Sequence, residues 1–265
     1  MKDNLTVLKL GGSVITQKEK PLTPNLEAIK RLAREIKEAN VKPLLVVHGG
    51  GSFGHWWAAK YRIRGGYRSQ EQLMGFSKTH QAMMTLNKLV VDALVDAGVP
   101  AFPVQPSSFI MTKRGHITQI KAEIIQKLVE LGLTPVLYGD AVVDSEMDFT
   151  ILSGDQLISS LAIRFNAKRI IIGVDVDGLY TADPKTAPTA QLIEHITLEE
   201  LKKRKHRIGR AKVTDVTGGM LGKITELIPA IERGIPIIIV NASKPNNIHK
   251  ALKEEKIKGT TIRKT

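Results

Sequence analysis

The chain has 265 residues, of which 42% are hydrophobic and 25% charged, and this ordinary globular composition excludes wholesale disorder. No apolar stretch approaches the roughly 20 residues of a membrane span, no signal peptide is recognisable, and the absence of cysteine excludes disulfides and thiolate chemistry, so we expect a cytoplasmic protein. The formal net charge of +13 favours anionic partners such as nucleic acid, acidic membranes or phosphorylated metabolites, although a heat-adapted, lysine-rich surface explains it equally well.

Short apolar runs recur along the chain, and a loop and a helical pattern follow them. Such nearly continuous runs are typical of strands buried on both faces of a parallel sheet. Alternating strands and helices predict an α/β fold. The expected strands are residues 5–10, 43–48, 134–138, 169–174 and 236–241, and the expected helices carry apolar stripes within residues 26–36, 86–94, 157–165 and 224–231.

Residues 107–118 and 141–152 break this alternation, with turn-forming residues between short apolar runs. They predict two hairpins, which would add an antiparallel edge or a lid. No repeat, low-complexity tract or linker interrupts the sequence. We therefore expect one continuous domain over residues 1–265, with two lobes that meet near residues 165–169.

The first expected strand ends in a glycine-rich segment, Lys9-Leu10-Gly11-Gly12-Ser13. Glycines let backbone N–H groups approach a phosphate closely, and a helix that starts there directs the positive end of its dipole at the anion. The segment is neither a Walker A loop nor a dinucleotide fingerprint, and a plain strand-to-helix turn would look similar.

A second glycine-rich segment, HGGGSFGH at residues 48–55, follows the second expected strand. Three successive glycines can form an anion-binding nest, and they lower stability in a way that a purely structural turn would avoid. Loops at the carboxyl edge of one parallel sheet can face one ligand, and Lys9 and Lys18 could reach it. The pair of loops is therefore a more specific signal than either alone.

Two further motifs follow later strands. Residues 173–184, GVDVDGLYTADP, bring together carboxylates and an aromatic ring that could hold a ribose and a base, although such residues also serve ordinary turns. Residues 215–223, DVTGGMLGK, open the last of the expected helices, with Lys223 in its first turn. Glycines and a lysine at a helix start describe a phosphate grip.

These four motifs together resemble the amino acid kinase superfamily from Lys9 to Lys223. The GSFGH segment that ends at His55, together with Lys18 and the SGD segment at residues 153–155, is similar to the isopentenyl phosphate kinase branch, which shares the histidine with fosfomycin kinase. The resemblance implies a three-layer αβα sandwich with a mainly parallel central sheet and hairpin additions.

The resemblance also implies the reaction and its partners. Residues of about 1–165 would form a phosphate-acceptor lobe, and about 166–265 a nucleotide-binding lobe. A cytoplasmic homodimer would use ATP and Mg²⁺ to convert isopentenyl phosphate to isopentenyl diphosphate in the alternative mevalonate pathway of isoprenoid biosynthesis. Mg²⁺ would be carried by ATP, with no ligand expected from the protein.

The chemistry of this reaction places few demands on a base. A phosphate monoester has a second pKa of about 6, so the acceptor oxygen is largely anionic at neutral pH. Catalysis then depends on holding two anions in line and neutralising the transferred group. The resemblance assigns ATP binding to Lys9, Gly11, Gly12, Ser13, Gly51, Asp175, Tyr180, Asp183, Gly219 and Lys223, catalysis to Lys9, Lys18, His55 and Asp155, and the acceptor phosphate to Gly50, His55 and Gly154.

Three of the polar residues have structural alternatives. His55 would hydrogen-bond the acceptor phosphate and so discriminate phosphate from carboxylate, whereas a histidine in a glycine-rich loop is often only a turn residue. Asp155 could orient Lys9 and Lys18 by charge pairing, or it could simply complement the dipole of its helix. His48, at the end of an apolar strand, is more typical of a structural residue.

The five-carbon tail of the acceptor requires an apolar pocket beside His55. Phe76 and Met83 are seven residues apart, which places them on one face of a helix, and Met84 lies next to Met83. Methionines fill such pockets adaptably, so we expect these three residues to hold the tail. Packing in the core is an equally good explanation for each of them taken singly.

The basic run at residues 202–212 leaves an alternative open. Clustered lysines and arginines can bind nucleic acid, but the run contains no aromatic residue for base stacking and directly precedes the glycine-rich nucleotide motif. We therefore expect no nucleic acid and no membrane partner. The alternatives are a fosfomycin-type phosphonate kinase, another small-molecule kinase, or a basic nucleic-acid-binding or regulatory module on a degenerate kinase fold.

Overall fold

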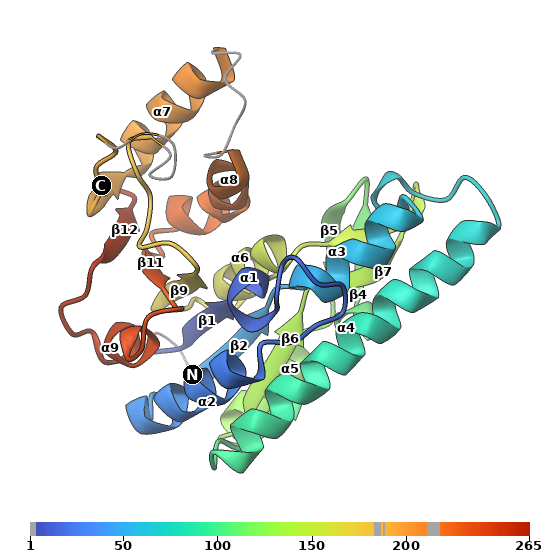
Figure 1. Ribbon diagram of the computed structural model, residues 1–265, viewed down its shortest axis with the longest axis horizontal. Helices are drawn as coiled ribbons and strands as arrows, with labels where there is room; N and C mark the ends of the chain where they lie inside the picture. The colour runs from blue at the N-terminus through green and yellow to red at the C-terminus, as the bar shows by residue number, and fades with distance from the viewer. Residues whose placement is uncertain (1–3, 183–186, 188, 211–217) are drawn as a thin grey trace.

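The computed structural model describes residues 4–182, 187, 189–210 and 218–265 (Figure 1). Its centre is an eight-stranded sheet in the order β10-β12-β11-β9-β1-β2-β6-β3, in which the described pairings are parallel except that of β11 with β12. The expected mainly parallel sheet is confirmed, and the five expected strands lie in it. The strands are β1 (Thr6–Leu10), β2 (Leu44–His48), β3 (Ala101–Pro103), β6 (Thr134–Tyr138), β9 (Arg169–Val174), β10 (His195–Thr197), β11 (Ile237–Asn241) and β12 (Gly259–Arg263).

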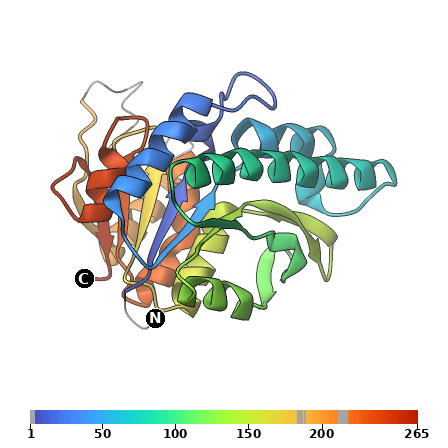
Figure 2. The ribbon, with the colours of Figure 1, turned by 90° about the horizontal axis from the view of Figure 1, so that it is seen from below.

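Helices cover both faces of this sheet, as Figure 2 shows. Successive side chains of a strand point to opposite faces, so Val7 packs in the core under α5, α6 and α8, whereas Leu8 packs in the core under α2, α4 and α9. The expected three-layer αβα arrangement is confirmed. The helices are α1 (Gly12–Ile15), α2 (Leu26–Ala39), α3 (Gly51–Lys60), α4 (Glu71–Asp96), α5 (Glu123–Glu130), α6 (Gly154–Arg164), α7 (Leu198–Arg210), α8 (Gly218–Glu232) and α9 (Asn247–Lys253), with short 3₁₀ turns η1 (Ile63–Gly65) and η2 (Pro106–Ser108).

The two expected hairpins are present as β4 (Ile110–Lys113) with β5 (His116–Ile120), and β7 (Asp140–Asp144) with β8 (Asp148–Leu152). They pair with each other through Thr112 and Asp144 and form a separate four-stranded sheet. The alternative of an antiparallel edge on the large sheet is therefore wrong. The carboxylate of Asp144 links the hairpins because it accepts a hydrogen bond from the Thr112 hydroxyl at 2.9 Å and from the Gly115 amide at 2.8 Å.

The order of the strands separates the two parts of the chain. Strands β2, β6 and β3 lie on one side of β1, and β9, β11, β12 and β10 lie on the other. The two-lobe division near residues 165–169 falls between these sets and stays a prediction. None of the helices in the described ranges is both long and apolar enough to cross a membrane.

Candidate active site

The two glycine-rich segments meet at the carboxyl ends of β1 and β2. The amide of Gly49 donates a hydrogen bond to the carbonyl of Leu10 at 2.9 Å. A Cβ atom on Gly12 would lie 2.2 Å from the backbone nitrogen of Gly51, and one on Gly51, whose φ is +48°, would lie 2.0 Å from Thr16 Oγ1. The backbones therefore approach more closely than any side chain permits.

Three helices begin at this edge, namely α1, α3 and α6. First-turn N–H groups of a helix lack intrahelical acceptors and carry the positive end of its dipole. Five backbone N–H groups at this edge donate to no acceptor within the described part of the chain, namely those of Gly12, Ser13, Gly50, Gly51 and Gly154. The amide of Gly11, by contrast, donates to Gly173 at 2.8 Å, so Gly11 joins β1 to β9 and does not offer its N–H to a ligand.

Lys9 and Asp155 form a buried ion pair between β1 and α6. Lys9 Nζ lies 2.5 Å from Asp155 Oδ1, and the two residues are only 4% and 7% exposed. Burial lowers the pKa of Lys9, and the charge and hydrogen bond of Asp155 oppose that shift. The pair lies against Gly154, where a Cβ atom would be 3.4 Å from Lys9 Cε. The expected pairing of Asp155 with Lys9 is thus present.

Lys18 has a different partner. Its ammonium lies 2.6 Å from Asp175 Oδ2, just beyond the end of β9, while the Ser13 hydroxyl donates to Asp175 Oδ1 at 3.0 Å. Burial opposes ionisation of Asp175, but these contacts outweigh it and lower the pKa of the carboxyl. The expectation that Asp155 also pairs with Lys18 is therefore wrong, because Lys18 lies in the loop after α1, which faces the end of β9.

His55 lies in the second turn of α3 and is exposed. Partial burial of the ring lowers its pKa, and the charges of Lys223 and Arg64 lower it further. The charge of Lys223 also lowers the pKa of Lys9, so these groups lie within electrostatic range of one another. Lys223 is the sixth residue of α8 and belongs to its second turn, not to the first as the sequence suggests. Arg64, in the η1 turn, was not singled out in the sequence, although Gly65 and Gly66 directly follow it.

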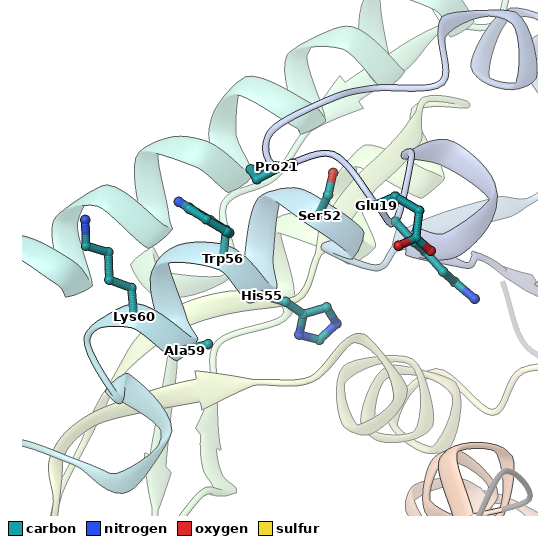
Figure 3. A pocket seen from close by; sticks show the side chains of 8 residues that line it. Glu19, Pro21, Ser52, His55, Trp56, Ala59 and Lys60 are labelled. Carbon is teal, nitrogen blue, oxygen red and sulfur yellow. The ribbon is translucent and has the colours of Figure 1, made fainter.

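A cavity of about 570 Å³ opens beside His55, and Figure 3 shows its lining along α3 and the loop before α2. Lys18 and His55 both line it, so the structure brings these two candidate residues to one space. Pro21, Trp56 and Ala59 supply an apolar wall that the sequence analysis did not identify. The remaining lining residues are Glu19, Ser52 and Lys60.

The three residues expected to hold the acceptor tail occupy different surroundings. Phe76 stacks on Phe149 with ring centroids 4.8 Å apart. Met83 is buried beneath the second glycine-rich segment, with its sulfur 2.9 Å from the Cβ position of Gly50. Met84 is 45% exposed, so it does not share the burial of Met83. The helix between them is continuous, as expected.

The residues expected to bind the nucleotide lie partly within the described ranges. The Tyr180 hydroxyl donates to Asp177 at 3.4 Å, and Asp177 also lies 2.6 Å from Lys244 Nζ. Gly219 lies at the start of α8, and Asp183 lies outside the described residues. Of the basic run, 202–204 are exposed on α7, and 211–212 lie outside the described residues. Over the described part of the chain, no group of three or more His, Asp or Glu side chains could hold a metal ion.

Comparison with known proteins gives consistent matches over almost the whole chain. The model of the amino acid kinase family matches residues 4–241. An isopentenyl phosphate kinase from Methanothermobacter thermautotrophicus is 42% identical, over 97% of this chain and 98% of that protein, and one from Methanocaldococcus jannaschii is 35% identical over the same shares. A crystal structure of an isopentenyl phosphate kinase superposes with a TM-score of 0.85 at 40% identity, covering 97% of this chain and all of that one.

Proposed function

The chain belongs to the amino acid kinase family, and we propose that it transfers the γ-phosphoryl group of ATP to isopentenyl phosphate, which yields isopentenyl diphosphate and ADP. The observation that carries this proposal is the contact of the two glycine-rich loops, with the buried Lys9–Asp155 pair beside Gly154 and with His55 on the helix that begins in the second loop. The acceptor side would be formed by residues of about 1–165, and the nucleotide side by about 166–265.

The family resemblance suggests the roles, and the geometry supports them. The unpaired amides of Gly12 and Gly51 would hold the transferred phosphoryl group, and those of Gly50 and Gly154 the acceptor phosphate. Lys9, held by Asp155, and Lys223 would neutralise the charge on the phosphates. Partial burial and the charges of Lys223 and Arg64 lower the pKa of His55, and the ring can donate an N–H to an oxygen of the acceptor phosphate in either protonation state.

Magnesium would enter with the nucleotide. The carboxylates nearest the glycine-rich loops, Asp155 and Asp175, are each engaged by a lysine, so the residues present favour a metal held by the phosphates of ATP. When bound there, Mg²⁺ supplies further neutralisation of the phosphoryl oxygens. The protein residues then need only to position the two anions in line.

A product screen tests the proposal directly. The purified chain is incubated with Mg-ATP and a panel of small phosphates, phosphonates and carboxylates, and products are identified by mass spectrometry. We expect isopentenyl diphosphate as the main product. An acylphosphate product, or phosphorylation of a phosphonate in preference to isopentenyl phosphate, would contradict the proposal.

Replacing His55 with alanine tests the acceptor contact. We expect kcat/KM for isopentenyl phosphate to fall at least about tenfold, because a hydrogen bond to a charged group contributes roughly 1.5–3 kcal/mol. His55→Gln, which can still donate, should retain part of the activity. Steady-state kinetics at saturating ATP measures both, and normal turnover by the alanine variant would make His55 structural.

The proposal includes a homodimer formed by acceptor-side helices. Leu73, Met84 and Val95 on α4 are 48%, 45% and 51% exposed, and their spacing of eleven residues is about three helical turns, so they form one apolar stripe. A second copy of the chain packed on this stripe would bury it. We expect light scattering to give the mass of two chains, and a Met84→Glu variant to give that of one; a monomeric unsubstituted chain would refute the dimer.

A further inference from the structure

A polar pair joins α4 to β7 on the inward face of the helix, where Gln72, Thr79 and Asn87 are also buried among apolar residues. His80 Nδ1 lies 2.8 Å from Asp140 Oδ1, and the Asp140 side chain is fully buried at the start of β7. The same carboxylate accepts hydrogen bonds from the amides of Ala141 at 2.8 Å and Ser107 at 3.2 Å. Asp140 therefore joins α4, β7 and the η2 turn at one point.

The neighbours of His80 on this face contact β8, the second glycine-rich segment and the end of β2. Residues 76, 80, 83 and 87 recur at intervals of three and four and so share one side of the helix. Phe76 stacks on Phe149 of β8, and Met83 lies beneath Gly50. Asn87 lies at the other end, with its side-chain oxygen 3.2 Å from His48 Nε2.

Apolar contacts alone tolerate small shifts of a helix along a sheet, whereas a buried ion pair has one favourable geometry. Such pairs add little net stability, but they can specify register. The hydrogen bond to Asp140 raises the pKa of His80, and partial burial opposes this shift. The net rise in pKa favours the protonated ring beside the carboxylate. Gln105 also raises the pKa of His80, and among the described residues Asp140 is the charged group that acts on this ring.

The backbone beside Asp140 is in contact with the phosphate end of the site. Gly139 donates its N–H to the carbonyl of His48 at 3.1 Å. A Cβ atom on Gly139 would lie 3.0 Å from the backbone nitrogen of Gly154, the first residue of α6. A displacement at Asp140 would therefore reach the amide that we assign to the acceptor phosphate.

We propose that His80 and Asp140 are positioning residues, which set the register of α4 and thereby the distance between the acceptor-phosphate cradle at Gly154 and Phe76, the residue that we expect to contact the acceptor tail. The inference rests on the proposed function of this site. It assigns the pair no contact with either substrate. We therefore expect that breaking the pair weakens binding of the acceptor and leaves binding of the nucleotide unchanged.

The test is a steady-state comparison of His80→Ala, His80→Gln and the exposed control His116→Gln on β5. We expect His80→Ala to raise KM for isopentenyl phosphate at least about fivefold with KM for ATP within about twofold, because a misplaced acceptor loses alignment. His80→Gln should recover most of this loss, since its amide can still donate to Asp140. The control should match the unsubstituted chain.

The outcomes are separable. No isopentenyl diphosphate from the unsubstituted chain refutes the proposed function itself. With an active unsubstituted chain, an unchanged KM for isopentenyl phosphate in His80→Ala, or equal rises in both KM values, overturns the positioning role alone. Should His80→Ala fail to fold, Asp140→Asn keeps the shape of the side chain without its charge, and the same split between the two KM values is expected of it.

Discussion

Replacing Lys18 with alanine is expected to lower kcat by at least about a hundredfold while changing KM for ATP by less than about threefold, because a charge that acts mainly in the transition state affects turnover more than binding. The structure makes this residue the cleanest one to test. Lys18 lies 2.6 Å from Asp175, and its side chain is 54% exposed. Such surface pairs contribute roughly 0–1 kcal/mol, so the ammonium can leave Asp175 for a phosphate at little cost.

A Lys9 variant cannot test the catalytic role of a positive charge in the same way. Its removal would leave Asp155 buried without a partner, and breaking a buried pair costs roughly 3–5 kcal/mol of stability. A loss of activity in a Lys9 variant would then mix catalysis with folding. Lys18 variants avoid this because Asp175 keeps its hydrogen bond from Ser13.

Two lysines provide controls for the Lys18 experiment. Lys20→Ala changes an exposed lysine of the same loop and should leave both parameters unaltered. Lys223→Ala, on the nucleotide side, should raise KM for ATP more than it lowers kcat. Pre-steady-state and steady-state kinetics with varied ATP give both quantities. Equal effects on both parameters in the Lys18 and Lys223 variants would contradict this division of labour.

Isopentenyl phosphate is expected to react with a kcat/KM at least about a hundredfold higher than that of fosfomycin, since each buried CH₂ group contributes roughly 0.8 kcal/mol. The smaller, polar phosphonate cannot gain this binding free energy from contact with an apolar wall. Competition between the two acceptors at limiting ATP measures the ratio. Comparable rates on both would overturn the selectivity.

Two apolar walls could hold the tail, and chain-length preference distinguishes them. Shrinking Phe76, or Met83, to alanine should admit longer allylic phosphates such as geranyl phosphate. Phe76 is the better test, because Met83 supports Gly50 and its truncation would cost roughly 2–5 kcal/mol. Trp56→Ala changes the apolar wall of the cavity between α3 and the loop before α2. A shift of preference in Trp56→Ala but not in Phe76→Ala would place the tail in that cavity.

Local patterns in the sequence were sufficient for much of the fold. Runs such as residues 170–174 are apolar throughout because both faces of a central parallel strand are covered, so their burial could be predicted without a structure. The glycines at 11–12 and 49–51 could be recognised in the sequence as loops at strand ends. In the structure these loops approach each other so closely that a side chain would not fit, which is why glycine is required there.

Partnerships between distant residues required the tertiary structure. Nothing in the sequence distinguishes the partners of Lys9 and Lys18, yet Lys9 pairs with Asp155 and Lys18 with Asp175. The alternation of side chains along β1 directs Lys9 toward α6, whereas the loop after α1, which carries Lys18, faces the end of β9. The pairing of His80 with Asp140 joins residues 60 positions apart. The hydrophobic periodicity of a helix does not indicate which strand residue its polar side chains will contact. The exposure of Met84 beside the buried Met83 depends in the same way on how α4 is rotated against the sheet, which only packing decides.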